Sequence, residues 1–189
     1  LPRVIAAAAK GDDALLRAMV GIFEDEGFRV IGVQDAAPAL VAGAGAVGRL
    51  SPRAEHLADI AQGFAIVDAL GALDVGQAAV VCEGLALSVE AAEGTDAMMA
   101  RVSALSEHLR GTPANRRGVL VKAPKPIQDR KTDLPVIGLR TVRNAGAIGV
   151  AGIALEAGGA LILEREAVAE AADALGMFVT GVRPGKCCG

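Results

Sequence analysis

The sequence predicts an α/β fold, in which an incomplete N-terminal α/β domain is followed by a complete, layered C-terminal α/β domain. Three observations support this class. Apolar runs of strand length recur along the chain, amphipathic segments of helical length lie between them, and glycines mark most of the boundaries. The 189 residues are 52% hydrophobic, which supplies enough apolar mass for one large domain or for one domain and part of another.

The first part of the chain predicts helices followed by a strand. The expected elements are a short helical piece over residues 1–10, a helix over residues 12–26 and a strand over residues 28–33. Asp12 is a natural N-cap of the second helix, and Gly27 ends it. Residues 34–52 then turn to Ala, Gly and Pro. We therefore interpret residues 1–52 as the remainder of an N-terminal domain and its linker.

The rest of the chain predicts strands and helices in alternation. Strands are expected over residues 75–81, 85–90, 118–121, 152–155, 160–163 and 177–182, and helices over residues 55–71, 96–109, 142–149 and 165–175. Gly158 and Gly159 are expected to turn the chain between two neighbouring strands. Residues 53–183 thus predict the C-terminal catalytic α/β domain, of roughly six strands, and residues 184–189 form a tail.

Glycines 43, 45 and 48 match the spacing of a dinucleotide-binding motif, but no strand leads directly into them. We interpret this segment as linker, which leaves a nicotinamide-dependent reductase as a weak alternative. Cys82 lies in an apolar strand and is expected to be a buried small hydrophobe, while His56 is expected to be exposed. The three cysteines give neither a disulfide framework nor a zinc motif, which favours a reducing compartment.

A proline-stiffened loop follows the strand at residues 118–121. Pro124, Pro126 and Pro135 fix the backbone and remove amide donors, so neither a helix nor an inner strand can run through residues 122–135. Loops at the carboxyl end of a strand face the crevice where ligands bind in open α/β sheets. We therefore predict a ligand site here. The alternative is a surface loop that binds no ligand and whose charged side chains are simply hydrated.

The side chains of this loop suit an anionic ligand. The candidate phosphate-binding and substrate-binding residues are Lys122, Lys125, Gln128, Arg130 and Lys131. Asp129 and Asp133 could hold a divalent cation or a water. Cleavage of a pyrophosphate needs charge neutralisation and an oriented water, which these groups could supply. No Ser–His or Cys–His pairing is evident, so direct attack by water is favoured over a covalent intermediate.

A second polar cluster follows the strand at residues 85–90. Thr95 or Asp96 can cap the next helix and leave its amides free for an anion, while Glu90 and Glu93 add acceptors suited to a hard metal or a ribose. Plain helix capping is an equal alternative. Gln77, after Gly76, interrupts the preceding strand and marks either a close approach of a ligand or a simple bulge.

The charge balance excludes some partners. The formal net charge is −3 and the chain holds no Trp or Tyr, which argues against a nucleic-acid binder. The local positive charge of residues 122–133 on an acidic chain suits a small anionic ligand better. No stretch approaches the roughly 18 apolar residues of a membrane span, and no signal peptide is visible.

Several segments together resemble one family, the LpxI-type UDP-2,3-diacylglucosamine pyrophosphatases of lipid A biosynthesis in Gram-negative bacteria. The resemblance covers nearly the whole chain. It rests on residues 11–17 (Gly-Asp-Asp-Ala-Leu-Leu-Arg), 73–77 (Leu-Asp-Val-Gly-Gln), 93–98 (Glu-Gly-Thr-Asp-Ala-Met), 121–122 with 126–135, and 152–154 with 156–158. The family's chains begin with a strand and a Gly-rich turn that this sequence lacks, so we expect residues to precede Leu1.

The resemblance implies a cytoplasmic hydrolase, dependent on Mg²⁺ or Mn²⁺, that splits UDP-2,3-diacylglucosamine into UMP and 2,3-diacylglucosamine 1-phosphate (lipid X). It implies two domains with the lipid held between them. By position it makes Asp133 and Asp129 catalytic, and Asp133, Asp96 and Glu93 metal ligands. The substrate-binding residues would be Lys122, Lys125, Gln128, Arg130, Thr95 and Gln77.

An amphiphilic substrate and the absence of a membrane span lead us to expect peripheral association with the inner face of the inner membrane, through a shallow apolar contact. A homodimer is also expected. A non-catalytic nucleotide or acyl-lipid binding module on the same scaffold is the alternative function.

Overall fold

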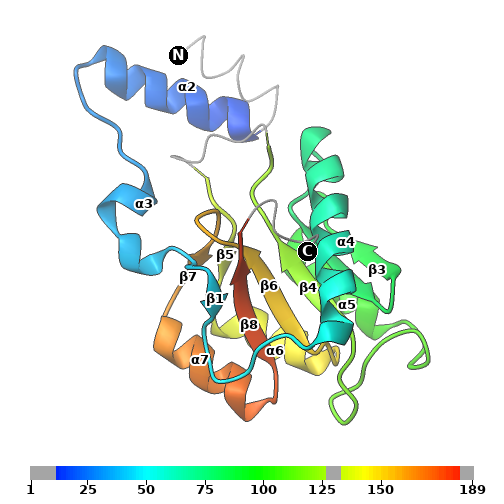
Figure 1. Cartoon of the computed structure of the whole chain (residues 1–189). Coiled ribbons are helices and arrows are strands. Elements are labelled where there is room, and N and C mark those ends of the chain that lie inside the picture. Colours follow the sequence, from blue (N-terminus) through cyan, green and yellow to red (C-terminus); the bar gives the residue numbers. More distant parts are fainter. Residues whose placement is uncertain (1–11, 127–132, 184–189) are drawn as a thin grey trace.

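The computed structural model describes residues 12–126 and 133–183, and it confirms the α/β class. The strands are β1 (Gly45–Ala46), β2 (Ala78–Cys82), β3 (Leu85–Val89), β4 (Val119–Lys122), β5 (Val136–Ile137), β6 (Gly152–Glu156), β7 (Leu161–Ile162) and β8 (Phe178–Val182). The helices are α2 (Asp12–Asp25), α3 (Val33–Ala36), η1 (Pro38–Leu40), α4 (Ala54–Ala72), α5 (Gly94–Ser103), α6 (Leu139–Ala147) and α7 (Arg165–Ala174). Figure 1 shows helices on both faces of the larger sheet.

The larger sheet is mixed, with strand order β1-β8-β6-β4-β2-β3. Its centre is parallel, since β4 pairs with β6 and β6 with β8 in the same direction, whereas β2 runs antiparallel to both β3 and β4. The carboxyl ends of β4 and β6 therefore lie at the same edge as the start of β2 and the end of β3. This arrangement brings Lys122 opposite Ala78.

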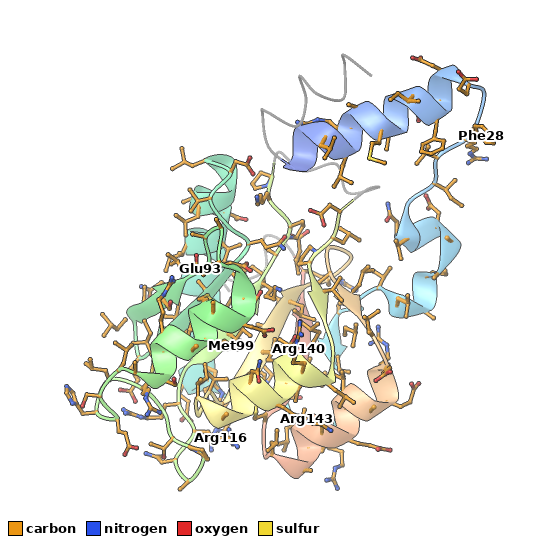
Figure 2. All side chains as sticks on the ribbon, turned by 180° about the vertical axis from the view of Figure 1, so that it is seen from behind. Phe28, Glu93, Met99, Arg116, Arg140 and Arg143 are labelled. Atoms are coloured by element: carbon orange, nitrogen blue, oxygen red, sulfur yellow. The ribbon has the colours of Figure 1, made fainter. Side chains whose placement is uncertain are left out.

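Helix α4 covers one face of this sheet, and α5, α6 and α7 cover the other (Figures 1 and 2). Alternate residues of β4 enter the two cores, as a strand requires: Val121 packs with Val67 of α4, and Leu120 packs with Met99 of α5. A Cβ on Gly63 would overlap the side chain of Val121, so α4 lies directly against β4.

Two polar side chains of α4 face the sheet. His56 is 6% exposed and Asp59 is 3% exposed, so the prediction that His56 is exposed was wrong. The reason is the helical period, which places residue 56 on the same face as the core residues Ile60 and Val67. Cys82 is buried, as predicted, and burial raises the pKa of its thiol.

The strand expected over residues 28–33 is not formed. Residues 28–32 make no strand pairing in the described part of the chain, and α3 begins at Val33. Phe28 instead donates its amide to the carbonyl of Phe23 and so closes the end of α2. An alternating apolar pattern forms a strand only where a partner strand accepts its hydrogen bonds.

The glycine-rich stretch at residues 43–48 contributes a strand that the sequence did not predict. Strand β1 pairs antiparallel with β8, with Gly45 opposite Gly181. A Cβ on Gly181 would overlap the carbonyl of Gly43, so the glycines permit a close approach of two backbones. The predicted boundary at residue 52 stays a prediction, although this segment is part of the larger sheet.

A second, two-stranded sheet joins β5 and β7 in parallel, with Ile137 opposite Ile162. The sequence placed residues 160–163 beside residues 152–155, and this prediction was wrong because β6 and β7 belong to different sheets. Gly159 donates its amide to the carbonyl of Glu156, so a tight turn redirects the chain away from β6. Within the part of the chain that the structure describes, no helix is long and apolar enough to cross a membrane.

Candidate active site

The candidate site lies where four elements end or begin at one edge of the larger sheet. Lys122 is the last residue of β4, Gln77 precedes β2, Glu90 follows β3, and Thr95 lies in the first turn of α5. In sheets with parallel centres, ligands bind at the carboxyl ends of the parallel strands. The topology therefore brings three predicted substrate-binding residues, Gln77, Thr95 and Lys122, to the expected edge.

Lys122 is buried, with 4% of its surface exposed. Its Nζ donates to Thr95 Oγ1 at 2.8 Å and reaches the carbonyl oxygen of Val136 at 3.4 Å. Burial lowers the pKa of Lys122, while the negative charges of Glu90, Asp96 and Asp133 act in the opposite direction. The ammonium group is thus held among carboxylates in a site with little water.

A chain of hydrogen bonds connects Lys122 to the start of β2. The Thr95 hydroxyl accepts from Lys122 and donates to Glu90 Oε1 at 2.7 Å, and the amide of Gln77 donates to Glu90 Oε2 at 3.3 Å. Glu90 is 6% exposed, so these bonds satisfy a buried carboxylate. A Cβ on Gly76 would overlap the carbonyl of Glu90, which explains why a glycine interrupts this strand.

The side chain of Gln77 points to an additional partner. Its Oε1 atom is buried and has no hydrogen-bond partner among the described residues. A buried amide oxygen without a partner is rare in a folded protein and usually indicates a water or a ligand. This observation supports a ligand role for Gln77 over the alternative of a simple bulge.

Asp96 and Glu93 have different partners. Asp96 Oδ2 lies 3.0 Å from Arg140 Nε, and its Oδ1 accepts from Asn144 at 3.0 Å, so it links α5 to the first turns of α6. Glu93 forms an ion pair with Arg101, and a backbone hydrogen bond lowers the pKa of Glu93. Figure 2 shows Glu93 at the beginning of α5 and Arg140 on α6.

The proline-stiffened loop is described only at its two ends. Lys125 Nζ lies 2.7 Å from Asp74 Oδ1, just after α4. Asp133 is half-buried, and its negative charge raises the pKa of Lys122 against the effect of burial. The predictions for Gln128, Asp129, Arg130 and Lys131 lie outside the described residues.

The predicted metal ligands are partly brought together. The negative charges of Asp96 and Asp133 both favour the charged form of Lys122, whereas the carboxylate of Glu93 forms an ion pair with Arg101. The described residues contain no group of three or more His, Cys, Asp or Glu side chains that could hold a metal ion. Any metal at this edge would therefore need further oxygen ligands from water or from a substrate.

Sequence reasoning missed several polar residues at this edge: Asp74, Arg140, Asn144 and Glu156. Glu156 ends β6 beside β4 and is 7% exposed. A carboxylate that ends a buried parallel strand was a readable signal, because such positions face the ligand crevice. Arg140 and Asn144 gave no such signal, since the pairing with Asp96 depends on how α5 and α6 pack.

The amino-acid sequence matches two family models. The LpxI N-terminal domain matches residues 1–40, and the LpxI C-terminal domain matches residues 43–180. A curated relative from Caulobacter vibrioides, named UDP-2,3-diacylglucosamine pyrophosphatase LpxI, is 52% identical over 184 residues. That match covers 97% of this chain and 66% of the relative, so the chain spans slightly less than two thirds of the relative's length. These matches confirm the resemblance seen in the sequence, and the chain belongs to the LpxI family.

Proposed function

We propose that this chain carries out the hydrolysis of UDP-2,3-diacylglucosamine to UMP and 2,3-diacylglucosamine 1-phosphate, a step of lipid A biosynthesis. The observation that carries the proposal is the 52% identity to a relative named for this pyrophosphatase activity. The geometry of the site supports it, because a buried ammonium group and nearby carboxylates suit the cleavage of an anionic anhydride.

In this reaction, water attacks one phosphorus atom and the bond from that atom to the bridging oxygen breaks. The bridging oxygen leaves with the other phosphate and takes the bonding electron pair. Lys122 is placed to stabilise the charge that develops on phosphate oxygens, and its hydrogen bond to Thr95 fixes the direction of the ammonium group. Asp133, near Lys122, is the proposed group that orients the water and accepts its proton.

We propose Mg²⁺ or Mn²⁺ as the cofactor, held by Asp96 and Asp133. Mg²⁺ commonly binds to one or two carboxylates, with waters and substrate phosphates completing its shell, so two carboxylates at this edge fit such an ion. The oxygens of Asp96 that accept from Arg140 and Asn144 each keep a second lone pair. When bound, the ion supplies charge neutralisation and a more acidic water. Glu93 does not fit this set, because Arg101 engages it.

The direct test is release of UMP from UDP-2,3-diacylglucosamine by the purified protein with Mg²⁺, with Mn²⁺ and with a chelator. We expect UMP with either metal and none with the chelator. The alternative function, a non-catalytic nucleotide or acyl-lipid binding module, predicts that the ligand is retained intact under every metal condition. Mass spectrometry of the bound and released lipid separates the two outcomes.

We also propose reversible association with the inner face of the cytoplasmic membrane. Exposed apolar side chains on α2 and after it support a shallow apolar contact: Phe23 is 50% exposed, Phe28 65% and Ile31 49%. In liposome flotation, we expect binding to persist at moderate salt. Binding that disappears when salt is added would show an electrostatic contact instead.

A homodimer is proposed as the assembly. The edge strand β3 supports it, because Leu85 is 49% exposed and β3 has a partner strand on one side only within the described sheet. Sedimentation velocity across a range of protein concentrations measures this directly, and a single monomer peak at all concentrations would contradict it.

A further inference from the structure

Two cavities that share lining residues open at the amino-terminal edge of the parallel strands, the edge opposite to Lys122. Their volumes are about 300 and 310 Å³, at the lower end of the range for small-molecule pockets. Arg53, His56 and Arg116 line both of them. Figure 2 shows Arg116 near the bottom of the view and Glu93 near mid-height, at the start of α5. The cavities are therefore separate from the candidate active site.

His56 carries a donor that faces these cavities without a hydrogen-bond partner. Its side chain is 8% exposed, and its Nδ1 accepts from the amide of Arg53 at 3.1 Å, so the proton of the neutral ring is on Nε2. Burial lowers the pKa of His56, which favours this neutral ring. Among the described residues Nε2 makes no hydrogen bond, and its contact with a carboxylate is an ion-pair contact with Glu55. The Oε1 of Glu55 lies 3.6 Å away and is held by Arg53 at 2.5 Å.

Arg116 supplies a fixed positive charge beside His56. Its guanidinium donates to the carbonyls of Leu175 at 2.6 Å and Gly146 at 2.9 Å, which hold the side chain against the ends of α7 and α6. No carboxylate in the described part of the chain lies within ion-pair distance of it. The charge of Arg116 is thus oriented by neutral groups and is available to an anion.

The larger cavity combines these donors with an apolar wall. It is lined by Leu50, Ser51, Arg53, His56, Arg116, Ala151, Gly176 and Phe178, and no carboxylate is among them. The N-cap of α4 is Arg53, whose side chain cannot accept hydrogen bonds from the first-turn amides of the helix, although its carbonyl accepts from the amide of His56 at 2.9 Å. Positive charge, a helix start and an imidazole donor that makes no hydrogen bond among the described residues therefore converge on one cavity, with the Glu55 carboxylate beside His56 and Arg53.

We propose that this cavity binds a phosphate-type oxyanion, either as free phosphate or as a phosphate monoester with a small apolar group. The oxyanion would accept from His56 Nε2 and from the guanidinium groups of Arg53 and Arg116. The apolar group of a monoester would contact Phe178, whose ring lies 5.1 Å from that of His56. This second site is distinct from the proposed site of pyrophosphate cleavage, because the cavity lies at the start of the parallel strands, lined by Ala151 and Phe178, whereas Lys122 lies at the carboxyl end of β4.

The test is an NMR titration of the His56 ring signals with inorganic phosphate at constant ionic strength. We expect a saturable shift that sodium chloride does not produce. Arg53→Gln should weaken phosphate binding by about tenfold, because it removes a charged donor. Arg29→Gln is the matched control, since it also removes one exposed charge but lies in the segment after α2. A second variant, His56→Asn, keeps an acceptor for the Arg53 amide and lacks the Nε2 donor. Because it has no His56 ring signal, its phosphate affinity is measured by isothermal titration calorimetry and compared with the parent and with Arg29→Gln by the same method.

Phenyl phosphate in a parallel titration distinguishes the two sources of the oxyanion. Tighter binding of phenyl phosphate than of phosphate identifies a monoester, and the reverse identifies the free anion. The proposal is overturned if the shift does not saturate, or if Arg53→Gln and His56→Asn both bind phosphate as tightly as Arg29→Gln does. The test measures phosphate binding and not UMP release. A negative result would therefore contradict the second site and leave the proposed hydrolysis unaffected.

Discussion

Thr95 is the residue that joins the buried ammonium group of Lys122 to the buried carboxylate of Glu90. Replacing Thr95 by Val keeps the shape but leaves both charged groups without this partner. We expect Thr95→Val to lower the free energy of unfolding by about 1–3 kcal/mol. Thr95→Ser keeps the hydroxyl and should lose much less. Urea unfolding measures both, and equal stability of the two variants would show that the hydroxyl does not support these charges.

Asp133 is the residue whose loss should separate catalysis from folding. It is half-buried in the second described end of the proline-stiffened loop, where a carboxylate can orient water without supporting the core. We expect Asp133→Ala to lower the rate of UMP release by about 10²- to 10⁴-fold. The free energy of unfolding should change by only about 0.5 kcal/mol. Asp35→Ala, on exposed α3, is the control.

UMP release at saturating substrate and metal, together with a melting curve, decides this prediction. Turnover within about threefold of the parent protein would remove Asp133 from the mechanism, since loss of a proton-transfer group costs far more than that. Lost turnover with a collapsed melting curve would make Asp133 a structural residue instead.

At the scale of residues, the sequence predicted part of the site. Lys122 was predicted because it follows a strand, Thr95 because it can cap a helix, and Gln77 because it interrupts a strand, and the sheet brings all three to one edge. Glu93 was grouped with Asp96 because the two are close in sequence. The structure separates them, because Arg101 binds Glu93 while Arg140 binds Asp96. Pairings of this kind depend on which helices are neighbours, and local sequence does not contain that information.

At the scale of elements, the contact between α4 and β4 depends on Gly63. A Cβ at this position would overlap Val121, so Gly63→Ala should force the helix away from the sheet. We expect a loss of about 1–3 kcal/mol in the free energy of unfolding. Gly21→Ala is the matched control, because nothing lies within 4 Å of a Cβ there and alanine should stabilise α2 by about 0.5–1 kcal/mol. Denaturant unfolding of both variants checks this prediction. The free energy of unfolding should fall in Gly63→Ala and rise in Gly21→Ala.

The start of α4 should make stability depend on pH. Burial lowers the pKa of His56 below its value in the unfolded chain, so the unfolded state takes up a proton first as the pH falls. The stability that depends on neutral His56 is complete above about pH 6.5 and is lost as pH falls through the folded-state pKa. Glu55 and Asp59 oppose this effect of burial, and Arg53 adds to it.

The measurement is the free energy of unfolding at pH 7.5 and at pH 5.5. We expect the free energy of unfolding to decrease more from pH 7.5 to pH 5.5 in the parent protein than in His56→Gln. The control His108→Gln removes an exposed histidine, and its decrease should equal that of the parent. Parallel decreases in the parent and in His56→Gln would show that His56 does not titrate with unfolding.

Helices with a regular apolar period were predictable, whereas strands were predictable only where the sequence also supplied a partner. Residues 85–89 follow residues 78–82 after a short turn, so the pairing of β2 with β3 could be expected. Residues 28–33 have a similar apolar pattern and form no strand, because no described strand pairs with them. Strand β1 was missed for the opposite reason. Its glycine-rich residues have low strand propensity, and the backbone of β8 decides their conformation.

At the scale of the whole molecule, the larger sheet has two edges with different chemistry. The carboxyl edge holds Lys122 among carboxylates, whereas at the amino edge Arg116 forms no ion pair among the described residues, although Glu55, Asp59 and Glu83 line a cavity there. The order of strands could not be read from the sequence, since β6 lies between β4 and β8 and the chain reaches β7 in another sheet before it reaches β8. Neither edge could therefore be assembled from the sequence alone, although the class of fold could.

The direct contact of Gly63 with Val121 also limits how the two edges can influence each other. One ligand can change the affinity for another only by shifting the protein between conformations that bind the two ligands differently. Because α4 packs directly against β4 at Gly63, the helix has no second position on the sheet. We therefore expect the coupling free energy to be near zero. Saturating phosphate should change the affinity for UMP by less than about twofold, and UMP should change the affinity for phosphate equally little. Calorimetric titrations of each ligand, with the other held at saturation, measure the two affinities. In Arg53→Gln the second site is weakened, so any effect of phosphate on UMP binding that remains comes from direct competition at the UMP site. Reciprocal changes of about fivefold or more in the parent protein, absent in that variant, would show that α4 transmits occupancy from one edge to the other.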